Sequence, residues 1–413
     1  MRTRNWLGLA LLVGLAALFI KVPPTSARPK STAKKTKPRV EVVFCLDTTG
    51  SMGGLIDGAK QKIWSLCNQI AGGKPTPELK VGLVAYRDRG DEYVTKVFDL
   101  SDDLDAVHAK LMGFVATGGG DEPESVNQAL HDALHKIHWS EGSGVLRIVY
   151  LVGDAPPHMD YPQDIPYTVS CRQACEKGII INTIQCGSIQ GTTPIWQEIA
   201  HKAEGRFVQI AQDGGVQTVA TPFDGRLAEI NAALAESAVA YGAAPVRAEA
   251  TARTLNGLTC GVGLSFDGSS PTMTHAIPMP APAGAGGAVG APMPCSATAC
   301  VASAADRAGY CAKTGKVAAL DLVDSIKEGK VRLEDVKTTD LPEEMQKLNL
   351  TERKAYLAKV EADRAKLQAE ALELDRKRTE FISQELRRRG GTGFDDQVID
   401  MLREQAKKVN IAY

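Results

Sequence analysis

In the stretch "VVFCLDTTGSMGG" (Val42–Gly54), an apolar segment is followed by an aspartate and then by residues rich in hydroxyl side chains and glycine. This pattern is typical of a buried strand in an α/β protein, whose carboxyl end presents a carboxylate at the edge of the sheet. Asp47 ends the apolar segment, and Thr49 and Ser51 follow it at alternate positions. Asp47 could therefore be either a phosphoryl-accepting nucleophile or a metal ligand.

The residues up to Ile210 alternate between strand-like and helix-like patterns. Strands are expected in the apolar, β-branched runs Val40–Leu46, Leu79–Tyr86, Tyr93–Phe98, Val145–Gly153, Gly178–Gln185 and Arg206–Ile210. Helical patterns lie between them, over about residues 55–71, 102–115, 123–138, 162–177 and 194–203. Near-continuous apolar strands indicate a sheet covered on both faces, and the alternation makes it largely parallel. We therefore predict a doubly wound α/β domain with its site beyond the carboxyl ends of the strands.

Two more polar clusters occur where strands meet helices. "ATGGGDEPESV" supplies Thr117, Asp121 and Glu124 before a helix, and "LVGDAPPH" places Asp154 at the end of the most hydrophobic strand. Strands that end in Asp47 and Asp154 are natural neighbours at the point where the strand order reverses, so their oxygens can converge.

The donors in these clusters are hydroxyl and carboxylate oxygens, with the imidazole of His158 nearby. Such a set favours a hard divalent cation, Mg²⁺ foremost, with Mn²⁺ or Ca²⁺ as alternatives. The cation would keep one position free for an incoming carboxylate.

The segments "FCLDTTGSMGG", "GLVAYRDRGDEY", "GGGDEPESVNQAL" and "LVGDAPPH" together resemble the von Willebrand factor A domain, over about 40% of the chain. The likeness is to the A domains of hemicentin-like and alpha-kinase-associated proteins, in an exported bacterial type. The metal-ion-dependent adhesion site of the family, Asp-x-Ser/Thr-x-Ser, falls on Asp47, Thr49 and Ser51, and its strand-end aspartate falls on Asp154. The resemblance implies metal-mediated binding of a protein partner that presents an acidic residue, and no catalysis.

One position departs from the family pattern. The third element of the family's site is usually a threonine after two glycines, whereas Asp121 aligns best there and Thr117 lies four residues earlier. We favour Asp121 as the third metal ligand, with Thr117 as the alternative. A directly bound Asp121 would raise the affinity for the cation and make it a weaker electrophile for a partner's carboxylate.

A catalytic role for Asp47 would require further residues that the sequence does not place around it. A phosphotransferase of the haloacid-dehalogenase type needs a second carboxylate two residues on, where this chain has Thr49, or the full "DKTGT" of ion-pumping ATPases. We therefore expect no enzyme, and keep an Mg²⁺-dependent aspartyl phosphotransferase or phosphatase as a disfavoured alternative. A structural scaffold with a non-functional site is the other alternative.

Two short motifs have simpler explanations than the functions they imitate. "HDALH" (His131–His135) imitates a zinc-protease motif, but its helical pattern places both histidines, with His138, on the solvent face. "RGD" (Arg89–Asp91) copies a cell-adhesion tripeptide and is expected to be coincidental. The neighbouring Arg87 and Asp88 could form a loop ion pair or contact the ligand face.

The first 27 residues have the pattern of a secretory signal peptide: a basic start, 14 apolar residues over Leu7–Ile20, and small residues before Ala27. The apolar run is short against the about 20 residues that span a bilayer, so an uncut membrane anchor is the alternative. We expect a basic linker over residues 28–39 and a periplasmic, cell-envelope or secreted protein.

The rest of the chain changes in composition. We expect residues 40–241 to hold the α/β domain with a packing helix, residues 242–316 to be an Ala/Gly/Pro-rich segment without a fold, and residues 317–413 to be helical. A long helix is predicted over Leu341–Arg389, followed by a short amphipathic helix. Cys260, Cys295, Cys300 and Cys311 could form two disulfides, with a zinc site as the disfavoured alternative.

The long helix carries half of a coiled-coil seam, at Val360, Leu367, Leu374 and Phe381. The positions four residues beyond are less apolar: Arg364, Ala371, Arg378 and Glu385. Weak self-association and a solvated rod both remain open. The net charge of -1 indicates no nucleic-acid partner, no pattern predicts a small-molecule cofactor, and membrane association is expected only if the N-terminal segment stays uncut.

Overall fold

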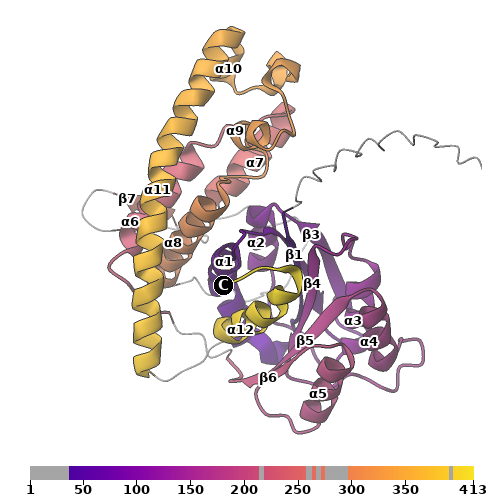
Figure 1. Cartoon of the computed structure of the whole chain (residues 1–413). Helices are drawn as coiled ribbons and strands as arrows, with labels where there is room; N and C mark the ends of the chain where they lie inside the picture. The colour runs from indigo at the N-terminus through magenta and orange to yellow at the C-terminus, as the bar shows by residue number, and fades with distance from the viewer. Residues whose placement is uncertain (1–36, 214–217, 257–262, 267–270, 275–295, 390–393) are drawn as a thin grey trace, which may run out of the picture. The chain divides into compact units, whose positions relative to one another are not determined.

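The computed structural model describes residues 37–213, 218–256, 263–266, 271–274, 296–389 and 394–413 (Figure 1). The expected signal peptide and most of the basic linker lie outside these residues, as do Cys260 and Cys295. Residues 37–413 form one compact unit. In the described part of the chain, no helix combines the length and the apolar character needed to cross a membrane.

A six-stranded sheet with the order β3-β2-β1-β4-β5-β6 organises the first half of the chain. Its strands are β1 Arg39–Asp47, β2 Glu78–Tyr86, β3 Thr95–Ser101, β4 Val145–Gly153, β5 Ile179–Cys186 and β6 Phe207–Ile210. All neighbouring pairs are parallel except β2 and β3. The predicted doubly wound, mainly parallel fold is confirmed, and the strand order reverses between β1 and β4.

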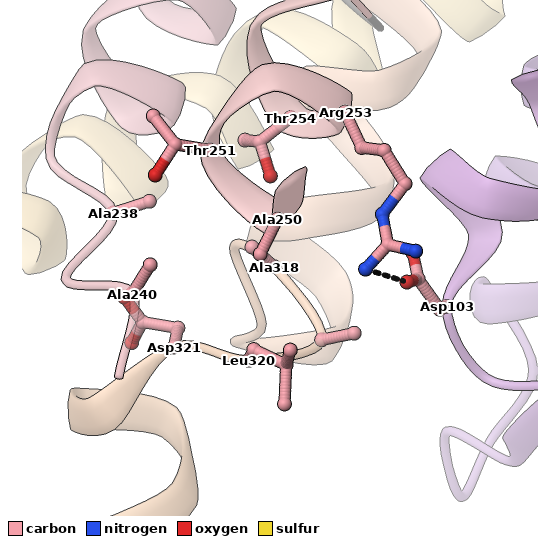
Figure 2. Close-up of a pocket in the computed structure, with 11 residues that line it drawn as sticks. Asp103, Ala238, Ala240, Ala250, Thr251, Arg253, Thr254, Ala318, Leu320 and Asp321 are labelled. Atoms are coloured by element: carbon pink, nitrogen blue, oxygen red, sulfur yellow. Dashed lines mark ion pairs between the residues drawn. The ribbon is translucent and has the colours of Figure 1, made fainter. Parts of the chain in front are cut away.

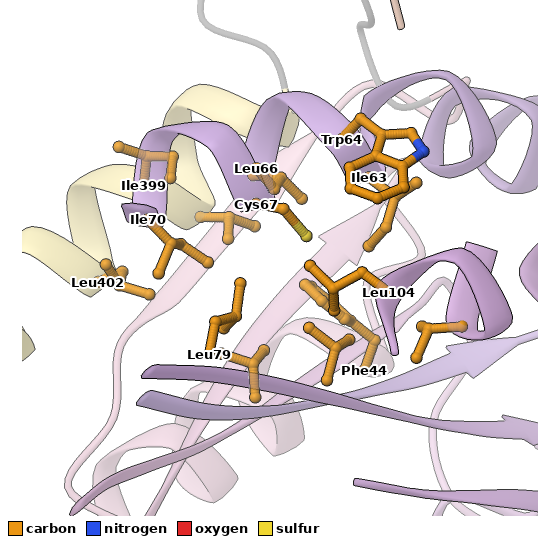
Figure 3. Packing of buried hydrophobic residues seen from close by; sticks show 14 of the residues in the cluster. Phe44, Ile63, Trp64, Leu66, Cys67, Ile70, Leu79, Leu104, Ile399 and Leu402 are labelled. Atoms are coloured by element: carbon orange, nitrogen blue, oxygen red, sulfur yellow. The ribbon is translucent and has the colours of Figure 1, made fainter. Parts of the chain in front are cut away.

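Helices cover both faces of this sheet, as the apolar strands require. They are α1 Gly53–Ala71, α2 Leu104–Met112, α3 Val126–His135, α4 Tyr167–Glu176 and α5 Thr192–Lys202, with a 3-10 turn η1 at Gly50–Met52. Alternate residues of β1 enter different cores, because successive side chains of a strand point to opposite faces. Phe44 packs in the core under α1, shown in Figure 3, whereas Val43 and Cys45 pack in the core against α3 to α5.

The second half of the chain is mostly helical. Its elements are α6 Asp224–Glu236, α7 Ala244–Asn256, β7 Gly263–Phe266, β8 Pro271–Thr274, α8 Ala297–Thr314, α9 Leu322–Lys327, η2 Leu333–Asp335, η3 Thr338–Asp340, α10 Glu343–Gln346, α11 Leu350–Arg389, α12 Phe394–Ala406 and η4 Lys407–Val409. The predicted start of the long helix at Leu341 is too early. Asn349 caps α11, because its Oδ1 accepts from the Glu352 backbone N–H at 3.0 Å.

The segment 242–316, expected to lack a fold, contains α7 and α8. Alanine favours helix, and small side chains let helices approach closely, so an Ala-rich composition is compatible with a buried helix. Gly309 illustrates this, because a Cβ there would collide with Asp375 of α11 and Asn68 of α1. We predicted that α11 either self-associates weakly or is a solvated rod. Neither alternative included the packing of α11 against α8 and α6.

Helix α12 packs on the sheet of the first half. Val398, Ile399 and Leu402 belong to the same core as Phe44 (Figure 3). The carboxamide of Gln405 donates to Asn182 of β5 at 2.8 Å and accepts from it at 3.1 Å. The amphipathic helix predicted at the C-terminus is therefore part of the core of the α/β domain.

Candidate metal centre

Asp47 ends the central strand β1 and lies in the predicted group of oxygens. Its Oδ1 accepts hydrogen bonds from the backbone N–H of Thr49 at 2.9 Å and from Thr49 Oγ1 at 2.7 Å. Thr49 Oγ1 lies 3.3 Å from Ser51 Oγ. The other oxygen, Asp47 Oδ2, is buried and has no hydrogen-bond partner among the described residues.

Asp154 follows β4, the neighbour of β1, as the topology predicted. It is buried, and its Oδ2 accepts from Gln212 Nε2 at 2.7 Å. The same Gln212 nitrogen lies 3.3 Å from the backbone oxygen of Ser51. Gly153 leaves room beside Asp47, because a Cβ there would lie 3.1 Å from Asp47 Oδ2. Gln212 thus ties the β1 loop to the β4 loop.

Glu124 is a buried carboxylate that the sequence interpretation quoted but did not assign. Its residue is 4% exposed, and Oε2 has no hydrogen-bond partner among the described residues. A Cβ on Gly119 would lie 3.3 Å both from Glu124 Oε1 and from Thr49 Cβ, so this carboxylate borders the β1 loop.

Burial and mutual repulsion make these acids weak. Burial raises the pKa of Glu124 to about 9, with Asp47 and then Asp88 as the largest repelling charges. Burial also raises the pKa of Asp47 to about 7, against the opposing hydrogen bonds from Thr49. Asp154 adds to the repulsion at both groups. A bound cation would therefore stabilise the ionised forms of these carboxylates.

Asp121 and Thr117 were the alternative predictions for the third ligand. Asp121 has a side chain that is 63% exposed, and its Oδ1 lies 3.7 Å from His158 Nε2. Thr117 donates its backbone N–H to the Thr48 carbonyl at 3.1 Å. Among the described His, Cys, Asp and Glu side chains, the three that come within 4.8 Å of one another are Asp88, Asp121 and His158. Hydroxyls and water would complete the coordination of a cation held by Asp47, Glu124 and Asp154.

Arg87 and the RGD tripeptide shape the loops around the site. Arg87 Nε donates to the Thr48 carbonyl at 3.1 Å, and Arg87 Nη2 donates to the Val115 carbonyl at 2.8 Å. Asp91 Oδ2 accepts from the Gly119 N–H at 3.0 Å, where Gly119 has a φ of 81°. Arg87 thus bonds to backbone, and the half-buried Asp91 bonds to the loop that precedes α3.

A pocket away from these acids lies where α7 meets the loop before α9 (Figure 2). Its wall includes Arg253 Nη2, which pairs with Asp103 Oδ2 at 3.4 Å. None of its lining residues belongs to the β1 and β4 loops. His131 and His135 of α3 stack with ring centres 4.3 Å apart. His135 and His138, which lies beyond the end of α3, are exposed as predicted, whereas His131 is half-buried.

Comparisons with known proteins identify similar domains. The family profile described as "von Willebrand factor A domain" matches residues 41–222. The "von Willebrand factor A domain-containing protein 7" of Rattus norvegicus is 37% identical over 125 residues, which are 30% of this chain and 14% of the relative. The protein of that name from Homo sapiens is 36% identical over 126 residues, again 30% of this chain and 14% of the relative.

Solved structures give a weaker likeness. The SpRpn10 VWA domain is 13% identical, with a TM-score of 0.33 over 42% of this chain and 89% of that chain. Proximal thread matrix protein 1 from the mussel byssus, "with zinc occupied MIDAS motif", is 16% identical, with a TM-score of 0.33 over 43% of each chain.

Proposed function

Because residues 41–222 form a von Willebrand factor A domain, we propose that this chain binds a divalent cation at the carboxyl ends of β1 and β4 and captures a protein partner through it. Domains of this family generally mediate protein–protein interactions. The proposed ligands, direct or through water, are Asp47, Thr49, Ser51, Asp154 and the newly found Glu124.

The observation that carries this proposal is a pair of unsatisfied carboxylate oxygens. Asp47 Oδ2 and Glu124 Oε2 are both buried without a hydrogen-bond partner among the described residues. A buried acceptor left unpaired costs about 1–3 kcal/mol, and more when it is charged. A cation between these groups and Asp154 would remove that cost, and the all-oxygen donor set favours Mg²⁺, with Mn²⁺ or Ca²⁺ as alternatives.

The partner's contact would be an acidic side chain, since the exposed side of the bound cation attracts a carboxylate. Ser51 is exposed beside the buried Asp47 and Thr49, so the loop opens toward solvent on one side. We also propose an extracytoplasmic location, for which the support is the basic start and the apolar Leu7–Ile20.

Thermal unfolding of the full chain, stripped with EDTA and then titrated with Mg²⁺, tests cation binding. We expect Mg²⁺ to raise the melting temperature, by an amount equivalent to about 2.7 kcal/mol at 100 times the Kd. Asp47→Ala should abolish the increase, whereas Glu141→Ala, an exposed acid before β4, should keep it. An unchanged wild-type melting curve would contradict the proposal.

Capture of a partner needs its own measurement. The immobilised chain should retain a protein from an envelope extract in Mg²⁺ and release it in EDTA, and Asp47→Ala should retain none. Cation binding without any Mg²⁺-dependent capture would instead support a structural module.

A further inference from the structure

A second group of side chains of metal-ligand type lies on three loops. Asp88 follows β2, Asp121 precedes α3, and His158 follows β4. His158 Nε2 lies 3.3 Å from Asp88 Oδ2 and 3.7 Å from Asp121 Oδ1. One ligand atom from each residue comes within 4.8 Å of the other two.

The orientation of His158 is set from its other side. Its Nδ1 lies 2.7 Å from Asp160 Oδ1, an arrangement in which Nδ1–H donates to the carboxylate. Nε2 then faces the carboxylates of Asp88 and Asp121. His158 is only 5% exposed, and Nε2 has no hydrogen-bond partner among the described residues. A carboxylate–histidine pair of this kind is the usual support of a metal-bound imidazole.

Asp88 is also held in place. Ser125 Oγ donates to Asp88 Oδ1 at 2.9 Å, and the Tyr161 hydroxyl donates to Asp88 Oδ2 at 2.8 Å. The Tyr161 ring stacks on the His158 ring, with the ring centres 4.1 Å apart. The buried half of the group is therefore fixed, while the exposed Asp121 can adjust to a ligand.

The two separations from His158 fit a four-coordinate ion. Zinc bonds to imidazole and carboxylate of about 2.0–2.2 Å place neighbouring ligand atoms of a tetrahedron about 3.3–3.6 Å apart. The separations of 3.3 and 3.7 Å from His158 Nε2 match these edges within about 0.1 Å. Octahedral coordination by Mg²⁺, with bonds of about 2.0–2.1 Å, would bring adjacent ligands to about 3.0 Å.

We propose that Asp88, Asp121 and His158 form a second cation site, of the zinc type, with a fourth position open to solvent on the side of Asp121. One imidazole and two carboxylates suit Zn²⁺ better than Mg²⁺, which prefers oxygen alone. The ion would join the three loops that border the first site, and so fix the rim that a partner meets. Asp121 then belongs to this site, and Glu124 takes its expected place at the first. The proposal does not depend on cation binding at Asp47.

Calorimetric titration of the full chain with Zn²⁺, in saturating Mg²⁺, tests the second site. We expect one Zn²⁺ per chain, and at least about tenfold weaker binding in Asp121→Asn. This variant should fold because Asp121 is exposed. The matched control is Glu122→Gln, whose exposed carboxylate faces Gly191 and should leave Zn²⁺ binding unchanged.

Co²⁺ gives a second readout, because four-coordinate Co²⁺ absorbs visible light far more strongly than octahedral Co²⁺. We expect intense bands in the wild type and in Asp47→Ala, and their loss in His158→Gln. Zn²⁺ affinity that is unchanged in Asp121→Asn, or lost only in His135→Gln on the outer face of α3, would overturn the proposal. Absence of Zn²⁺ binding would also overturn it, and would assign His158 to an imidazolium that neutralises its acidic neighbours.

Discussion

At the scale of single residues, Glu124 distinguishes this site from the expected one. Its pKa is raised from about 4.5 in the unfolded chain to about 9 in the fold. Between these values the native state binds more protons than the unfolded state, so this group lowers the stability of the metal-free protein as pH rises. The penalty is complete above the folded pKa.

Glu124→Gln should therefore stabilise the EDTA-treated protein relative to the wild type, by a margin that widens from pH 6 to pH 9. The same change should weaken Mg²⁺ binding, because the glutamine carries no charge. Urea unfolding at several pH values measures the first effect, and calorimetry measures the second. A margin that stays constant with pH would mean that Glu124 does not titrate in this range.

Part of the site could be predicted because its residues lie on one short loop. Asp47, Thr49 and Ser51 alternate after a buried strand, and the loop geometry brings them together. We predicted Asp121 or Thr117 as the third ligand and did not assign Glu124, whose burial is a tertiary property that no local pattern indicated. Gln212 comes from the loop after β6, and no local pattern indicated it.

At the scale of elements, the long helix α11 shows why a heptad count was misleading. The face that was judged unsuited to a seam is buried, and its arginines are paired: Arg364 with Asp321, and Arg378 with Asp224 and Asp306. An arginine stem packs like an apolar side chain when acids on a neighbouring element receive its guanidinium. Those acids lie on distant parts of the chain, so periodicity within the helix could not reveal them.

Arg378→Met tests this packing. It would leave Asp224 and Asp306 buried without their cation, and should lower the free energy of unfolding by about 3–5 kcal/mol. Arg376→Met is the matched control, since Arg376 is exposed on the same helix and should change stability by less than about 1 kcal/mol. Equal effects of the two changes, measured by urea unfolding, would contradict the assigned role of Arg378.

At the scale of the whole molecule, the C-terminal residues complete a domain that begins near residue 39. The strands, the helices on both faces and the adjacency of β1 and β4 could be predicted from apolar runs and their alternation, whereas the complete strand order could not. The contribution of α12 did not, because a short amphipathic helix indicates only that one face is covered. The contacts of Val398 and Leu402 identify the sheet of the α/β domain as the surface that they cover.

Leu402→Ala should therefore destabilise the α/β domain itself, by about 2–5 kcal/mol, because Leu402 is fully buried in its core. Asp400→Ala, an exposed position on the same helix, should have little effect. Trp64 lies in that core, so its fluorescence can report the unfolding. Comparison with a Trp64→Phe chain separates its signal from that of the other tryptophans. An unfolding midpoint unchanged by Leu402→Ala would place α12 outside the cooperative unit.

The central claim is that a cation is held where β1 and β4 end. Anomalous X-ray scattering from crystals grown with Mn²⁺ locates the ion directly, since Mn²⁺ is one of the cations expected there. We predict an anomalous peak beside Asp47, Ser51 and Glu124, which disappears in Asp47→Ala crystals. A Mn²⁺ peak found at Asp88, Asp121 and His158 with none beside Asp47, or no peak at either place, would contradict the account.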